Sequence, residues 1–191
     1  MKTVDARGKA CPEPVILTRK ALTEANKLLV IVDNDTSQMN VRRMAEKSGY
    51  RVETEQKADG IYVQITPGAS SATAEKSGNG HTIVVLVAGD TLGRGEAELG
   101  NVLIRGFLHT LNEVEPLPST IILINSGVKL AGEGSPVLDD LRALGDKGVE
   151  ILACGTCLNY YGLKDKLAVG QVSDMYSITE VLLRSDRVIS V

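Results

Sequence analysis

Three cysteines are the side chains of this sequence best suited to covalent chemistry, and they occur in two places. Cys11 opens the stretch Cys-Pro-Glu-Pro, and Cys154 and Cys157 are the two ends of Cys-Gly-Thr-Cys. A thiolate attacks disulfide or persulfide sulfur, so a cysteine whose thiolate form is favoured can accept a sulfur atom and pass it on. We therefore expect Cys11, Cys154 and Cys157 to be the catalytic residues.

The surroundings of Cys11 predict a thiol at the start of a helix. Pro12 and Pro14 suit a first helical turn, where no N–H is needed and φ is already set. The positive end of the helix dipole lowers the pKa of a nearby thiol, and basic residues just before the motif would add to this effect. Glu13 opposes it. The alternative is that Cys11 is a small buried side chain and that the prolines only stop a strand.

The Cys-Gly-Thr-Cys stretch directly follows a predicted strand, at the end where parallel sheets bind their ligands. Two thiols at this spacing can form a disulfide, supply half of a zinc site or relay a persulfide. A zinc site needs two further ligands, and neither His81 nor His109 has a partner at ligand spacing. We therefore expect no metal and no cofactor.

Two supporting residues accompany this second motif. Gly155 follows Cys154 in the turn, and Lys129 lies in a loop expected at the same sheet edge. Lys129 would supply positive charge to a thiolate or persulfide at Cys154, or it would be a solvated loop lysine. Cys157 in particular would alternatively be a buried thiol that faces the core.

The hydrophobic pattern of the first half predicts a small two-layer sandwich with β-α-β-α-β-β order, over residues 1–67. Its two helices are expected to begin near Pro14 and among Asp35, Thr36 and Ser37. Its expected strands are Lys2–Asp5, Leu28–Val32, Tyr50–Glu55 and Ile61–Ile65.

The second half, residues 81–191, alternates strands and helices. Apolar strands in such an order indicate a parallel sheet covered on both faces, a three-layer α/β/α domain. A stripe that includes Leu99, Val102 and Leu103 predicts a helix after the first strand. The expected strands are Ile83–Ala88, Thr120–Asn125, Val149–Ala153, Ala168–Val172 and Arg187–Val191.

Composition narrows the class of protein. The 191 residues carry a net charge of −3, which gives no general attraction to nucleic acid or to an anionic membrane. No apolar run is long enough for a membrane span, and the first residues lack the apolar core of a signal peptide. We expect a cytoplasmic protein with reduced thiols. Residues 68–80 contain no large apolar side chain and are expected to be a flexible linker.

The first half resembles the TusA-like or SirA-like sulfur carriers, through Cys-Pro-x-Pro after the first strand of a β-α-β-α-β-β domain. That resemblance implies that Cys11 receives sulfane sulfur as a persulfide, with Pro12 and Pro14 holding the helix start. The second half resembles the DsrE-like family, whose reactive cysteine would correspond to Cys154. The fusion of both is similar to the YedF-type proteins associated with selenium metabolism. Donor and acceptor proteins, and a homo-oligomer through the second domain, are the partners that this implies.

Three hypotheses about function remain at this point. The first is a carrier, sulfurtransferase-like if it is a catalyst, in which Cys11 and Cys154 exchange a sulfur or selenium atom. The second is a thiol–disulfide oxidoreductase that uses Cys154 and Cys157. The third is a non-enzymatic binding or regulatory module in which the cysteines are structural.

Overall fold

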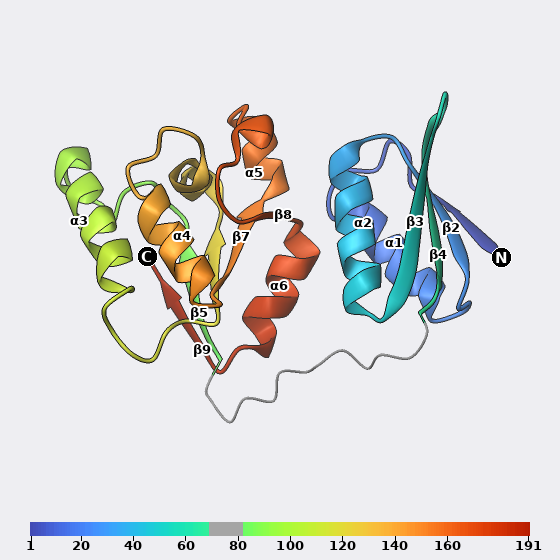
Figure 1. Ribbon diagram of the computed structural model, residues 1–191. Coiled ribbons are helices and arrows are strands. Elements are labelled where there is room, and N and C mark those ends of the chain that lie inside the picture. The colour runs from blue at the N-terminus through green and yellow to red at the C-terminus, as the bar shows by residue number, and fades with distance from the viewer. Residues whose placement is uncertain (69–81) are drawn as a thin grey trace. The chain divides into compact units, whose positions relative to one another are not determined.

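The computed structural model describes residues 1–68 and 82–191 (Figure 1). The chain divides into two compact units, residues 1–79 together with 174–177, and residues 80–173 together with 178–191. The expected linker, residues 68–80, lies outside the described residues apart from Gly68, and so does His81. No helix in the described part of the chain is long and apolar enough to cross a membrane.

The first unit is a four-stranded sheet with two helices on one face (Figure 1). The strand order is β1-β2-β4-β3, in which β1 pairs parallel with β2 and the other pairs are antiparallel. This confirms the predicted two-layer sandwich. Its elements are β1 (Lys2–Asp5), α1 (Glu13–Leu22), β2 (Leu28–Val32), α2 (Asp35–Lys47), β3 (Tyr50–Lys57) and β4 (Gly60–Pro67).

The cap of α2 lies one residue before the expected group of capping residues. Asn34 is the cap, and its side-chain oxygen accepts a hydrogen bond of 2.9 Å from the N–H of Ser37. The inward side chains of β2 and β4 then meet those of the two helices in one apolar core.

The second unit is a five-stranded parallel sheet with the order β8-β7-β6-β5-β9. Its strands are β5 (Ile83–Val87), β6 (Thr120–Leu123), β7 (Glu150–Cys154), β8 (Gln171–Ser173) and β9 (Arg187–Ser190). Its helices are α3 (Ala97–Thr110), α4 (Leu138–Asp146), α5 (Gly155–Tyr160) and α6 (Met175–Arg184), with the 3-10 helices η1 (Asn125–Ala131) and η2 (Lys164–Lys166).

Helices cover both faces of this sheet, which confirms the predicted three-layer α/β/α arrangement. α3 and α4 lie on one face and α6 on the other (Figure 1). The strands β5, β6 and β7 are neighbours in the sheet, and their mostly apolar side chains fill the core on both sides. Their carboxyl ends therefore meet at one edge of the sheet.

The helix α3 was predicted correctly, but the apolar stripe that predicted it is the outer face. Leu99, Val102 and Leu103 are 56%, 62% and 44% exposed. α3 is apolar on two faces, and only packing against the sheet selects the face that is buried. The residues that α3 buries are Gly100, Ile104 and Leu108.

Candidate thiol sites

Cys11 lies in the loop between β1 and α1, and its side chain is partly exposed. Pro12 is the residue before the helix and Pro14 stands in its first turn, positions at which the helix needs no N–H from them. The peptide bond between Cys11 and Pro12 is cis. The thiol thus stands directly before a helix, where solvent reaches it.

The basic residues just before this thiol are paired with carboxylates. The guanidinium of Arg7 donates hydrogen bonds to Asp5 at 2.6 Å and to Asp59 at 3.0 Å. The bonds from Arg7 lower the pKa of Asp5 to about 2. The ammonium group of Lys9 lies 3.3 Å from a carboxylate oxygen of Glu13. Acidic neighbours therefore offset each positive charge that the sequence places here.

Backbone contacts anchor the same loop to the end of β2. The N–H of Gly8 donates to the carboxylate of Asp33 at 2.6 Å, and this bond is the main reason that the pKa of Asp33 lies below its usual value. The N–H of Ala6 donates to the carbonyl of Ile31 at 2.8 Å. The loop is thus fixed at its base, before it reaches the cysteine.

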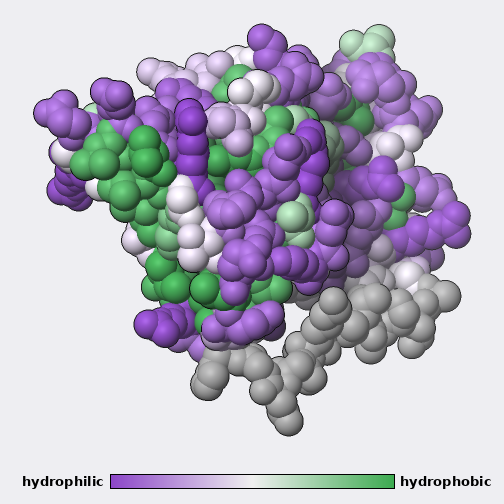
Figure 2. All heavy atoms as spheres, turned by 60° about the vertical axis from the view of Figure 1, so that its left-hand side comes forward, coloured by the Kyte–Doolittle hydropathy of each residue, from purple (hydrophilic) through white to green (hydrophobic). Residues whose placement is uncertain are grey.

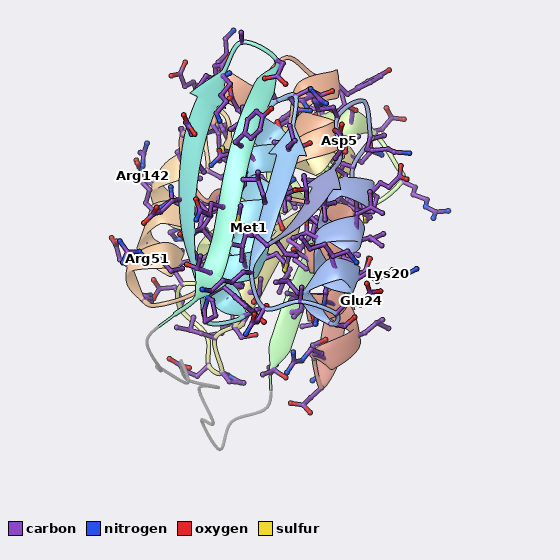
Figure 3. All side chains as sticks on the ribbon, turned by 90° about the vertical axis from the view of Figure 1, so that its right-hand side faces the viewer. Met1, Asp5, Lys20, Glu24, Arg51 and Arg142 are labelled. Atoms are coloured by element: carbon purple, nitrogen blue, oxygen red, sulfur yellow. The ribbon has the colours of Figure 1, made fainter. Side chains whose placement is uncertain are left out.

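The other end of α1 is fastened to the start of β1. Figure 3 shows Asp5 at the end of β1, and Lys20 and Glu24 toward the C-terminal end of α1. The carboxylate of Glu24 accepts a hydrogen bond from Lys2, and this bond lowers the pKa of Glu24. A charged pair therefore ties the segment after α1 to the start of β1.

The second candidate site lies at the edge of the parallel sheet where β5, β6 and β7 end. Asp90 follows β5, Asn125 begins η1 after β6, and Cys154 is the last residue of β7. Gly127 lets η1 pass close to β5, because a Cβ there would lie 2.4 Å from the carbonyl oxygen of Val87. Three segments distant in sequence therefore meet at this edge.

The two thiols of the Cys-Gly-Thr-Cys motif have different surroundings. Cys154 is 1% exposed, and burial raises the pKa of its thiol to about 11. Gly155, buried as well, begins α5 directly after it. Cys157 is partly exposed, its sulfur accepts a hydrogen bond of 3.1 Å from the N–H of Asn125, and its side chain also bonds that of Cys154. Cys157 is thus the more accessible thiol.

Aromatic and basic side chains adjoin Cys157. The hydroxyl of Tyr161 donates to the side-chain oxygen of Asn125 at 3.2 Å, and the ammonium group of Lys129 lies 4.9 Å from the Tyr161 ring centre. Asn125 has a φ of 49°, which an asparagine tolerates better than most residues. Tyr160, by contrast, is 84% exposed and contacts the edge of Tyr161.

Lys129 forms an ion pair with Asp90, with 2.9 Å between nitrogen and oxygen. The other carboxylate oxygen of Asp90 accepts a bond of 2.9 Å from the hydroxyl of Ser126. Burial raises the pKa of Asp90, but these two hydrogen bonds outweigh it and leave the pKa below its usual value. Asp90 and Ser126 had no expected role. The only signal in the sequence was their position shortly after apolar strands.

A hollow of about 170 Å³ lies beside this ion pair. Its wall combines the two charged groups of the pair with polar and apolar side chains of α3 and of the loop before α4. Solvent can therefore approach Lys129 from the side of α3. The lining residues are Asp90, Asn101, Ile104, Arg105, Lys129, Leu130, Ser135 and Pro136.

Within residues 1–68 and 82–191, His, Cys, Asp and Glu side chains form no group of three that would hold a metal ion. His109 lies on the exposed side of α3 and contacts Asp140 at 2.9 Å. That contact raises the pKa of His109. The observed role of His109 is thus to pair with a carboxylate at the surface.

The family described as "Sulfurtransferase TusA" matches residues 2–66. A protein of Methanocaldococcus jannaschii named "Putative sulfur carrier protein MJ0990" is 44% identical over 55 residues, which cover 27% of this chain and 73% of that protein. The chain belongs to the TusA-like family. Among solved structures, the SirA-like protein of Desulfitobacterium hafniense is 44% identical to the TusA-like part, over 36% of this chain and 99% of its own, with a TM-score of 0.34.

C-terminal to the TusA-like part, residues 109–191 match the DsrE/DsrF-like family. A protein of unknown function from Methanobacterium thermoautotrophicum is 19% identical over 59% of this chain and all of its own, with a TM-score of 0.46. The ychN protein of E. coli is 21% identical over 58% of this chain and 99% of its own, with a TM-score of 0.44. The chain is thus a TusA-like part fused to a DsrE-like part, and the two family matches support a role in sulfur relay.

Proposed function

We propose that this protein is a sulfur carrier that accepts a sulfane sulfur atom on Cys11 as a persulfide and passes it on through Cys157. The observation that carries the proposal is the partly exposed Cys11 thiol before the first turn of α1, in a unit that belongs to the TusA-like family. Solvent access lets a donor protein reach this thiol. Proteins that donate and accept sulfur are therefore its partners.

The chemistry is a thiol–persulfide exchange. The Cys11 thiolate attacks the terminal sulfur of a donor persulfide, the sulfur–sulfur bond of the donor breaks, and the donor leaves as a thiolate. No net oxidation occurs and no cofactor is needed. The same exchange moves the atom onward from Cys11 to Cys157, within one chain or between two.

Cys157 replaces Cys154 as the second station of this proposal. The sequence pointed to Cys154 because it ends a strand, but its thiol is buried and holds its proton up to high pH. Cys157 is partly exposed, and its sulfur accepts a hydrogen bond from the N–H of Asn125. An incoming persulfide would therefore reach Cys157 before Cys154.

Intact-mass spectrometry tests the loading step. The purified full chain is incubated with a cysteine desulfurase and cysteine, and we expect a gain of about 32 Da that a reductant removes. The variant Cys11→Ser should lose this gain, whereas Cys154→Ala, a matched control at a buried thiol, should keep it. Persulfide formation that survives Cys11→Ser unchanged would refute the proposal.

A separate question is whether the carried atom is sulfur or selenium, since a selenium atom bound to sulfur undergoes the same exchange. The test is the mass of the protein purified from cells grown with and without selenite, where selenium adds about 79 Da instead of 32 Da. The free thiols of all three cysteines suit this chemistry and a reducing, cytoplasmic location. Loss of the increment in Cys11→Ser identifies the site.

A thiol–disulfide oxidoreductase is the second candidate function. It is favoured by one observation, the contact between the Cys154 and Cys157 side chains in a single helical turn. Titration of the pair in glutathione buffers tests it, because an oxidoreductase requires a disulfide that forms and breaks reversibly in that range. If the pair stays reduced in all of these buffers, the oxidoreductase is excluded. The carrier or a non-enzymatic binding module then remains.

We also propose that the DsrE-like unit forms a homo-oligomer through the outer face of α3. Leu99, Val102 and Leu103 give this helix an exposed apolar stripe, and Figure 2 shows apolar patches on the side of the molecule that carries α3. The variant Val102→Glu should reduce the mass measured by analytical ultracentrifugation. A monomeric wild type at micromolar concentration would contradict this assembly.

A further inference from the structure

Cys154 and Cys157 form a pair of thiols in which one is enclosed and the other accessible. Cys154 ends β7 inside the core, and Cys157 stands three residues later in α5 with its side chain against that of Cys154. Of these two thiols, the proposed carrier uses only Cys157. A nucleophile placed behind it, with no access to partner proteins, therefore has no part in the chemistry described so far.

We propose that Cys154 is the resolving thiol of the site, and that it expels the sulfur carried on Cys157 as hydrogen sulfide. This inference rests on the proposed function, because it requires a persulfide on Cys157. It adds a product, sulfide or its selenium counterpart, to a protein that otherwise only hands its cargo from thiol to thiol.

The step balances without an added reactant. The Cys154 sulfur attacks the inner sulfur of the Cys157 persulfide, a bond forms between the two cysteine sulfurs, and the bond to the outer sulfur breaks. The outer sulfur takes both electrons of that bond and leaves as HS⁻, which receives the proton of Cys154. Two cysteine sulfurs are oxidised to a disulfide while the cargo sulfur is reduced to sulfide.

The geometry favours attack on the inner sulfur. Cys154 lies on the core side of Cys157, where the buried apolar side chains of Leu158 and Leu152 pack at the density of a protein interior. An added sulfur on Cys157 must therefore point toward the open side, by Asn125 and Tyr161. The inner sulfur then remains the atom that faces Cys154.

The product also places the protein in a reaction sequence. A disulfide between Cys154 and Cys157 ends the cycle until a dithiol reductant restores both thiols. The reaction that follows must consume sulfide or selenide as a nucleophile, in contrast to one that takes a persulfide directly. The carrier reaction at Cys11 needs no such reductant.

The test uses the full chain with Cys11→Ser, so that only the second site is loaded. The protein is treated with inorganic polysulfide, desalted, and followed by sulfide assay and intact mass without reductant. We expect about one sulfide per chain and a disulfide between Cys154 and Cys157 in the peptide map. Adding Cys154→Ala should leave the persulfide on Cys157 and slow sulfide release at least about tenfold.

The control adds Cys157→Ser instead, which should remove both the persulfide and the sulfide. Cys154→Ser serves as a second substitution at the buried position, and circular dichroism reports whether each variant is folded. Sulfide release that is equally fast in folded Cys154→Ala overturns the inference but leaves the carrier intact. Absence of any persulfide on Cys157 in folded Cys154→Ala also overturns it, whereas failure of Cys11 to load in the otherwise unchanged chain refutes the carrier.

Discussion

Cys11 and Cys157 are both partly exposed thiols, but the structure holds them in different ways. The Cys11 loop is fixed by contacts that precede the thiol, the ion pairs of Arg7 and the bond from Gly8 to Asp33. Cys157 is held by contacts to its own sulfur, from the N–H of Asn125 and from the Cys154 side chain.

This difference separates two kinds of sulfur chemistry. A thiol on an anchored loop can meet many partner proteins, and it exchanges sulfur without a change of oxidation state. A thiol with a second thiol behind it can also transfer electrons, because a disulfide is available as the oxidised product. Under the proposed function, the fusion of the two parts combines a thiol that exchanges sulfur with partner proteins and a thiol pair that reduces the carried atom.

The comparison between the two thiols predicts its largest effect on the transfer of sulfur from Cys11 to Cys157. When Cys11 is loaded first, the sulfur should leave Cys11, and the peptide with Cys154 and Cys157 should become persulfidated or, after release of sulfide, disulfide-bonded. In Cys157→Ser we expect that movement to fall at least about a hundredfold, since no accessible acceptor remains. Peptide mapping after alkylation measures it, and Tyr160→Phe is a control at an exposed neighbour. Equal transfer in both variants would remove Cys157 from the relay.

The burial of Cys154, in contrast to Cys157, predicts the next largest effect, on the rate at which the thiol is alkylated. Because the pKa of Cys154 is raised from 9.0 to about 11, its thiolate fraction near pH 8 is lower by about a hundredfold than for an unshifted thiol. Its alkylation by iodoacetamide should rise about tenfold per pH unit until the pH nears 11. Mass spectrometry of each cysteine peptide at pH 7 to 10 measures this. Fast alkylation of Cys154 at pH 7 would contradict the burial.

A third prediction perturbs only the second site. Gly127→Ala places a Cβ against the carbonyl of Val87, and we expect a loss of about 3 kcal/mol in the free energy of unfolding of the DsrE-like unit. Gly106→Ala in α3, where a Cβ meets no atom within 4 Å, should instead stabilise by about 1 kcal/mol. Thermal denaturation of both variants measures the difference in stability. Equal melting temperatures would show that η1 shifts away from β5 without a loss of stability.

The smallest effect concerns the ion pair beside the second site. Asp90→Asn should cost about 1 kcal/mol near pH 7, because Lys129 and Ser126 lose a charged acceptor. Since the pKa of Asp90 is lowered on folding, this difference should be present above its ordinary pKa and vanish as the pH falls through the lowered value.

Asp139→Asn, at a fully exposed carboxylate that pairs with Arg142, is the matched control and should change the stability little. Urea denaturation at pH 7 and at pH 3 measures both variants. A pH-independent loss in Asp90→Asn would show that the ion pair contributes nothing.

The sequence by itself determined the two folds and the positions of the thiols along them. Strand and helix periods, the prolines after Cys11, and the apolar strands of the second half are local patterns that need no knowledge of distant contacts. They sufficed for both layer arrangements and for the placement of Cys11 before a helix and of Cys154 at a strand end.

Only the tertiary structure decided which thiol is open and which groups surround it. Burial depends on what packs across an element, so the pattern around Cys154 and Cys157 could not reveal that the first lies in the core. The same reason explains the outward stripe of α3, which is apolar on two faces, and the pairing of Lys129 with Asp90 across 39 positions of sequence. Strand order brings such residues together, and strand order is a property of the whole sheet.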